Sequence, residues 1–102
     1  MQRFGLEEEV IIKIQNVFSQ FPEIEKAILY GSRAKGNYKP ASDIDLSLVG
    51  TKLTLSVLNK IDWALDDLFL PYTFDLSVYS MLENKNLLEH IKRVGIVFFE
   101  KE

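Results

Sequence analysis

The sequence contains no cysteine, and only three prolines and five glycines among 102 residues. Without cysteine there is neither a disulfide framework nor a thiolate metal site, so the fold must rest on side-chain packing. This composition suits a reducing compartment, and we expect a cytoplasmic protein. The length fits one domain, residues 1–102, that can bury a core of its own.

The chain also lacks a long hydrophobic run and an excess of basic residues. No apolar stretch approaches the roughly eighteen residues that span a bilayer, and the start MQRFGLEEEV has no signal-peptide pattern. We therefore expect neither secretion nor membrane insertion. The net charge of −3 argues against extensive nucleic-acid binding, which normally uses a basic face. It does not exclude a small nucleotide that brings its own metal ion.

Helical spacing of apolar residues predicts three helices. The first begins near Leu6 and ends before Pro22. The second begins between residues 51 and 56 and ends before Pro71. A shorter third helix runs to Gly95, which we expect to be a left-handed cap. The apolar positions that define the three helices are Leu6, Val10, Ile14, Val17, Phe18, Phe21, Val57, Leu58, Ile61, Ala64, Leu65, Leu68, Phe69, Leu87, Leu88 and Ile91.

Four short segments have the pattern of strands. Residues 27–30 and 96–99 are apolar runs of the kind that form buried strands, whereas residues 43–48 and 74–79 alternate polar and apolar side chains. The residues between the first two strands in the chain are predicted to form a loop. The order is therefore helix, strand, loop, strand, helix, strand, helix, strand. It predicts a mixed α/β (α+β) domain with a single sheet.

The predicted loop from Gly31 to Ser42 differs from the rest of this acidic chain. It contains three cations and no acid. Gly31 permits close backbone approach, and Ser32 with neighbouring N–H groups can donate to phosphate oxygens. Arg33 is placed to add a charged fork. The loop is therefore a candidate phosphate-binding segment.

Two predicted strands each carry aspartate on the face opposite their apolar residues. Asp43 and Asp45 lie two residues apart, a Cα separation of roughly 6.5 Å along a strand, and Asp75 has the matching position in residues 74–79. Carboxylates gathered on one face repel each other unless a cation neutralises them. Oxygen ligands favour Mg²⁺ or Mn²⁺. A pair of such ions, about 4 Å apart, acts on phosphates in phosphoryl and nucleotidyl transfer.

These residues resemble the signature of the nucleotidyltransferase superfamily, which has a DNA polymerase beta-like fold. The signature combines Gly31-Ser32, Asp43-Ile44-Asp45 and Asp75. The segment GSRAKGNYKPASDIDL looks more narrowly like the minimal nucleotidyltransferases, which are often encoded beside a helical HEPN-domain partner. The resemblance extends over essentially the whole chain. It implies a single mixed sheet covered by helices, in the order α-β-β-α-β-α-β.

The resemblance also implies a function and a role for each residue. Asp43 and Asp45 would hold two Mg²⁺ ions, with Mn²⁺ as a substitute, and Asp75 would complete the cluster and act as general base. Gly31, Ser32 and Arg33 would bind a nucleoside triphosphate. The implied activity moves AMP from ATP onto a hydroxyl of a HEPN-type partner, so that the chain acts as its antitoxin. A homo- or hetero-oligomer is compatible with this role.

Two further functions stay open. One is an antitoxin that neutralises its partner by contact alone, and the other is transfer to a small molecule or an RNA end. For single residues, plain structural roles compete with the functional ones. Asp62, Asp66 and Asp67 are expected to form a solvated helix face. His90 is expected to pack at the surface.

Overall fold

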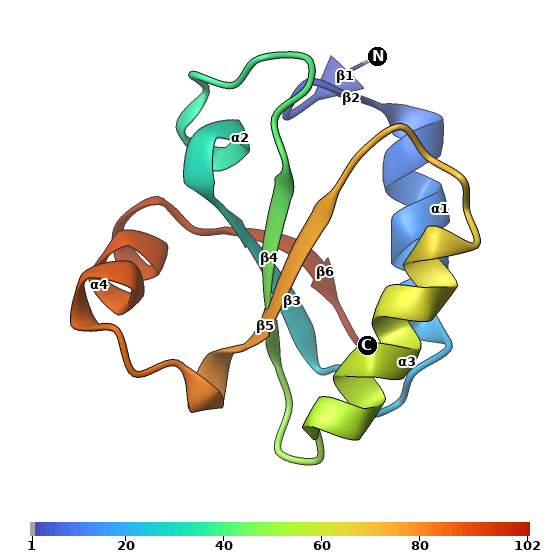
Figure 1. The fold of residues 1–102 in the computed structure, drawn as a ribbon, viewed down its shortest axis with the longest axis vertical. Helices are drawn as coiled ribbons and strands as arrows, with labels where there is room; N and C mark the ends of the chain where they lie inside the picture. The colour runs from blue at the N-terminus through green and yellow to red at the C-terminus, as the bar shows by residue number, and fades with distance from the viewer. Residues whose placement is uncertain (1) are drawn as a thin grey trace.

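The computed structural model describes residues 2–102, and these residues form one mixed four-stranded sheet with helices on both faces (Figure 1). Met1, the first residue of the predicted domain, lies outside them. The strand order is β5-β4-β3-β6, with bounds β3 Lys26–Tyr30, β4 Ile44–Val49, β5 Phe74–Val78 and β6 Ile96–Glu100. Strand β3 is antiparallel to β4 and β6, whereas β4 and β5 run parallel. The predicted fold class is confirmed.

The helices lie in two layers, one on each side of the sheet (Figure 1). Helices α1, Glu8–Ser19, and α3, Leu55–Asp66, cover one face. Helices α2, Gly31–Lys35, and α4, Lys85–Val94, lie on the other, and a short 3₁₀ turn, η1, Tyr79–Met81, leads from β5 toward α4. Within residues 2–102, no helix is long and apolar enough to cross a membrane.

The hydrophobic core lies between the sheet and the α1/α3 layer. Strand β4 shows how the sequence builds it, because Ile44, Leu46 and Leu48 are all fully buried and the alternate positions face the other side. Burial of each such side chain contributes about 1.5–3 kcal/mol. The helices supply the matching apolar stripes, namely Ile11, Ile14, Val17 and Phe18 from α1, and Ile61 and Leu65 from α3.

The N-terminal residues fold differently from the prediction. Helix α1 begins at Glu8, and Leu6 belongs instead to strand β2, Leu6–Glu7, which pairs with β1, Gln2–Arg3. The turn between them places Phe4 and Gly5 in the left-handed region, at φ 59° and 74°. Leu6 is fully buried, but it reaches the core from a strand. Its position fitted the helical spacing of apolar residues because that spacing indicates which side chains are buried. It does not show whether a helix or a strand carries them.

The predicted loop from Gly31 to Ser42 begins with a short helix. Helix α2 closes at Gly36, a left-handed cap at φ 90° whose N–H donates to Ser32 O at 2.9 Å. Only the rest of the segment is irregular. A five-residue helix is too short to show an apolar period, which is why the sequence pattern missed it.

Helices α3 and α4 begin at side-chain caps. The hydroxyl of Thr54 accepts a hydrogen bond from the Val57 N–H at 3.2 Å, which fixes a start that the sequence left open. The amide oxygen of Asn84 accepts from the Leu87 N–H at 3.0 Å in the same way. Each cap satisfies one backbone donor that has no partner inside the helix.

Gly95 ends α4, but the prediction of a left-handed cap was wrong, since its φ is −60°. Its N–H donates to Ile91 O at 2.8 Å. A Cβ at this position would collide with that same carbonyl oxygen and lie 2.8 Å from Cγ2 of Ile28 on β3. Glycine is required here because the end of α4 approaches the sheet closely.

Candidate active site

Asp45 and Asp75 are register partners in the parallel pair of β4 and β5. Paired residues of adjacent strands project from the same face of a sheet. Ser47 and Ser77, the next residues on that face, confirm this, because their hydroxyls are hydrogen-bonded at 3.0 Å. Both carboxylates therefore lie on the face opposite the core. Asp43 precedes β4 by one residue and is exposed.

The start of α2 lies directly against the carboxylate of Asp45. A Cβ on Gly31 would collide with Oδ2 of Asp45, and the φ of Gly31 is 75°. Both observations require glycine here, one for space and the other for backbone conformation. Ser32 follows within the same turn and is partly exposed. The sequence-predicted Gly31, Ser32 and Asp45 are thus brought together.

The carboxylates carry negative charge that the protein neutralises only in part, because Arg33 lowers the pKa of Asp45 less than burial and the other aspartates raise it. Burial, followed by the charges of Asp75 and Asp43, raises the pKa of Asp45 to about 6. The one ion pair within residues 2–102 joins Arg3 and Glu8 at the surface, so none of the three aspartates has a salt-bridge partner there. Such a cluster is favourable for a bound cation.

The donor set fits Mg²⁺ completed by a substrate better than a metal held by protein alone. Among residues 2–102, no three histidine or acidic side chains are grouped closely enough to hold an ion by themselves. Mg²⁺, however, is usually bound through one or two carboxylates together with substrate phosphates and water. The aspartates supply oxygen donors with uncompensated charge, and a triphosphate beside Gly31 and Ser32 would supply the rest.

Arg33, expected to reach phosphate, instead makes hydrogen bonds inside the protein. It is only 1% exposed. Its Nε and Nη2 donate to Ser42 O at 3.2 and 2.8 Å, Nη2 also donates to Pro40 O at 3.2 Å, and Nη1 donates to Phe4 O at 2.8 Å. Four hydrogen bonds to three carbonyls leave the guanidinium little capacity for a ligand.

Two tyrosine rings complete the surroundings of Arg33. Its guanidinium carbon lies 5.5 Å from the ring centroid of Tyr38 and 5.1 Å from that of Tyr72. These contacts join α2 to the segment before Asp43 and to the segment before β5. We conclude that Arg33 fixes the backbone around the site, which the sequence did not reveal because its partners are backbone carbonyl groups, and these leave no pattern in the sequence.

His90 is the residue near the site that the sequence missed. The Gly31 N–H donates to its Nε2 at 3.1 Å. Its ring also meets the Tyr30 ring edge to face, with centroids 6.1 Å apart at 82°. The expected role was surface packing. The available signal was its place on α4, three residues after Leu87 and at the edge of the apolar stripe.

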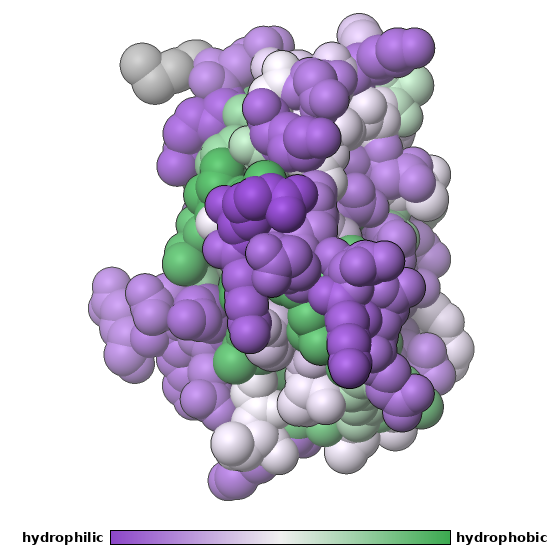
Figure 2. All heavy atoms as spheres, turned by 90° about the vertical axis from the view of Figure 1, so that its left-hand side faces the viewer, coloured by the Kyte–Doolittle hydropathy of each residue, from purple (hydrophilic) through white to green (hydrophobic). Residues whose placement is uncertain are grey.

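The surface around the site is polar. Figure 2 faces the α4 side of the molecule and shows mainly hydrophilic side chains with smaller apolar areas. A recess of about 270 Å³ borders the edge strand, where Asn59 and Asp62 of α3 lie opposite Phe74, Asp75 and Leu76 of β5. Asp75 thus lies beside an open recess.

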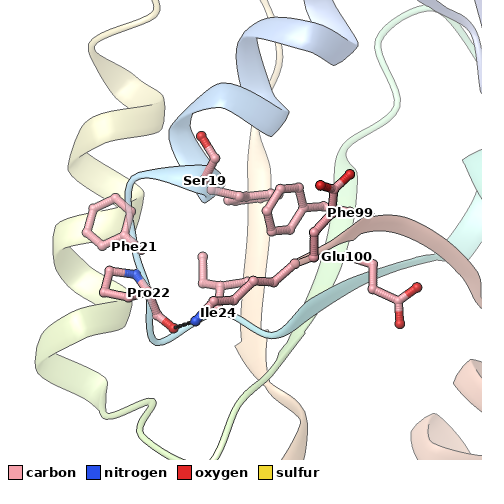
Figure 3. A pocket seen from close by; sticks show the side chains of 9 residues that line it. Ser19, Phe21, Pro22, Ile24, Phe99 and Glu100 are labelled. Carbon is pink, nitrogen blue, oxygen red and sulfur yellow. Dashed lines mark hydrogen bonds between the residues drawn. The ribbon is translucent and has the colours of Figure 1, made fainter.

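A further cavity lies away from these aspartates. It has a volume of about 380 Å³ and lies between the end of α1 and the end of β6 (Figure 3). Nζ of Lys101 donates to Pro22 O at 3.1 Å across it. This cavity adjoins the Lys26 end of β3, whereas Gly31 follows the opposite end. It is mainly apolar, lined by Phe18, Phe21, Ile24 and Phe99 among others, and is separate from the aspartate site.

Comparison with known proteins identifies the family and the fold. Residues 12–102 match the family described as polymerase beta, nucleotidyltransferase. No curated protein matches the chain in sequence.

Several solved structures share the fold. A crystal structure of a toxin–antitoxin with AMP-PNP aligns at a TM-score of 0.70 and 20% identity, over 95% of this chain and 76% of that one. A tri-AMPylated Shewanella oneidensis HEPN toxin in complex with MNT antitoxin aligns at a TM-score of 0.68 and 15% identity, over 94% of this chain and 74% of that one. The toxin–antitoxin MntA–HepT aligns at 0.67 and 15%, over 93% and 74%. At these identities the likeness concerns the fold.

Proposed function

The chain belongs to the polymerase beta nucleotidyltransferase family, and on that premise we propose that it transfers AMP from ATP to a hydroxyl of a HEPN-type partner protein and so acts as its antitoxin. The observation that carries the proposal is the pairing of Asp45 with Asp75 beside Gly31. Solved structures of the same fold include one with AMP-PNP and one with a tri-AMPylated HEPN toxin.

In the proposed site, Asp43 and Asp45 would hold two Mg²⁺ ions, with Mn²⁺ as a substitute. Bound there, the ions would supply neutralisation of the triphosphate charge and would make the α-phosphorus more electrophilic. Ser32 donates its hydroxyl to a phosphate oxygen, and Gly31 allows the phosphates to approach the backbone. The absence of a large side chain at Gly31 is what lets nucleotide and carboxylates share one small space.

Asp75 is the proposed general base. It is exposed on the edge strand, where an acceptor hydroxyl can reach it. The acceptor oxygen forms a bond to the α-phosphorus while the bond from that phosphorus to the bridging oxygen breaks, and pyrophosphate leaves. Asp75 accepts the hydroxyl proton.

A partner protein is the best-supported source of that hydroxyl. The recess that Asp75 borders, about 270 Å³, is smaller than typical small-molecule pockets of about 300–1,000 Å³. A tyrosine is a chemically suitable acceptor, because its pKa of about 10 makes deprotonation easier than that of an aliphatic alcohol. We therefore propose a tyrosine of the helical partner as the acceptor.

Incubation of the chain with ATP, Mg²⁺ and a HEPN-domain partner tests the proposal. Intact-mass spectrometry should show the partner gaining AMP units, and Asp43→Ala should abolish the gain. Each α-labelled nucleoside triphosphate in turn identifies the preferred base. A partner whose mass stays unchanged while its toxicity is suppressed would exclude transfer as the mechanism.

One observation favours the contact-only antitoxin as a second candidate. Trp63 and Phe69 are 69% and 89% exposed at the end of α3, and large exposed aromatic side chains are common at protein interfaces. Phe69 also has a positive φ of 53°, which is unfavourable for a bulky residue. A variant lacking Asp43, Asp45 and Asp75 that still neutralises the partner would support this candidate.

A further inference from the structure

We propose that His90 is a positioning residue of the nucleotide site, which anchors the Gly31 amide and leaves Ser32 to face the phosphates. The inference rests on the proposed function, since it assigns a role within that site. Its basis is the hydrogen bond from the Gly31 N–H to Nε2 of His90, 3.1 Å long. Gly31 is also the residue that lies against Asp45. His90 therefore acts on the point where the phosphate-facing turn meets the carboxylates.

The helix that carries His90 is held firmly against the sheet. Its neighbour Ile91 is only 3% exposed. Gly95 at the end of the helix approaches Ile28 of β3 so closely that a Cβ would lie 2.8 Å from Cγ2 of Ile28. A side chain on such a helix can hold a loop atom in a defined place, because its own backbone has little freedom to move.

The contact also defines the protonation state of His90. A backbone N–H only donates, so Nε2 must be the unprotonated nitrogen of a neutral imidazole. The ring proton is therefore on Nδ1. This tautomer is an observable consequence of the contact, independent of any catalytic activity.

Two features of His90 can be separated by substitution. Its ring meets the Tyr30 ring edge to face, and any aromatic side chain can reproduce this packing. Its Nε2 accepts from the Gly31 amide, and this needs an acceptor atom. His90→Phe keeps the ring and removes the acceptor, whereas His90→Gln keeps an acceptor on a side chain of similar reach.

Without the hydrogen bond to His90, the backbone at Gly31 is less restrained before the nucleotide binds. Ordering it on binding then costs free energy, and affinity falls accordingly. We expect His90→Phe to weaken binding of an ATP analogue with Mg²⁺ about tenfold, the size expected for one lost hydrogen bond. His90→Gln should restore most of the affinity. Transfer should show a raised KM for ATP and a kcat close to that of wild type.

The experiment combines calorimetric titration of AMP-PNP and Mg²⁺ with kinetics of transfer and ¹⁵N NMR of the imidazole. Glu89→Gln on the exposed side of the same helix is the matched control and should bind like wild type. Thermal melts establish that each variant is folded. The imidazole nitrogens of wild type should report a neutral ring protonated on Nδ1.

Three outcomes decide the inference. A proton on Nε2 would show that the contact with Gly31 does not form. Equal affinities for wild type and His90→Phe, with transfer intact, would overturn the role of His90 and leave the proposed function standing. Failure of wild type itself to bind AMP-PNP would overturn the proposed function, and the role of His90 with it.

Discussion

Asp45 and Asp75 face each other across the parallel strands β4 and β5, one step along from the hydrogen-bonded hydroxyls of Ser47 and Ser77. The neighbouring serine pair is neutral, and its two hydroxyls form a hydrogen bond with each other. Two carboxylates instead repel. The register of β4 and β5 thus holds two carboxylates that repel each other side by side. Such a destabilising arrangement is expected of a binding site and not of a stabilising contact.

Replacing Asp45 by Asn should stabilise the protein at neutral pH. The pKa of Asp45 is raised from 3.8 to about 6, so the folded state favours the protonated carboxyl. The stability it contributes is therefore fully present below about pH 4 and is lost as pH rises through about 6. Because the side chain is partly exposed to solvent, we expect a gain of only roughly 1 kcal/mol at pH 8.

Urea denaturation of Asp45→Asn and wild type at pH 8 and pH 4, in EDTA, measures this effect. The two proteins should differ at pH 8 and converge at pH 4. An equal difference at both values would show that the repulsion is not its source.

Nucleotide and metal together should stabilise wild type by binding at Asp45. A ligand present at a hundred times its Kd stabilises the native state by about 2.7 kcal/mol. AMP-PNP with Mg²⁺ should therefore raise the melting temperature of wild type and leave that of Asp45→Asn unchanged. Differential scanning calorimetry makes the comparison, and an equal rise in both proteins would count against Asp45 as a ligand.

The two glycines of α2 should differ sharply on substitution by alanine. At Gly31 an added Cβ collides with Asp45, whereas at Gly36 it meets nothing within 4 Å, although both have positive φ. We expect Gly36→Ala to cost about 1 kcal/mol from backbone strain alone and to bind nucleotide normally. Gly31→Ala should cost more and lose AMP-PNP binding. Equal binding by both variants would contradict the close approach at Gly31.

Arg33→Lys should reveal a structural role. Lysine keeps the positive charge but not the fork that donates to Ser42, Pro40 and Phe4. We expect a loss of roughly 2–3 kcal/mol of unfolding free energy, as for several broken hydrogen bonds to a buried charged group. Lys35→Ala, on the exposed end of α2, is the control and should be near neutral. A stable Arg33→Lys protein with weakened nucleotide binding would instead support a phosphate contact.

The exposed aromatic residues in α3 and just after it should matter for the partner and not for the nucleotide. Substituting Trp63 and Phe69 by Ser should weaken binding of a HEPN-domain partner at least tenfold, as for loss of an aromatic anchor worth about 2 kcal/mol. Ile12→Ser on α1, where Ile12 is 47% exposed, is the matched control. Binding of AMP-PNP should be the same in all variants. An undiminished partner affinity in calorimetry would place the interface elsewhere.

Much of this protein follows from the sequence by itself. Local periodicity determines the main helices and strands, because burial of one face leaves a period of two or 3.6 residues in the chain. The alternation around Asp43 and Asp45 indicated that both face away from the core, and Asp75 repeated that pattern. The glycine at position 31 indicated a close approach. These inferences depend only on neighbours along the chain.

Other features depended on contacts that leave no pattern in the sequence. Arg33 has the positive charge that binding a phosphate would require. Only the positions of Phe4, Pro40 and Ser42 in the fold show that its guanidinium donates to backbone carbonyls instead. His90 had no motif, because the Gly31 amide that it anchors lies 59 residues away. A single charged residue or a single histidine produces no periodic pattern in the sequence. Its partner is decided by how helices and strands pack, and only the tertiary structure shows this packing.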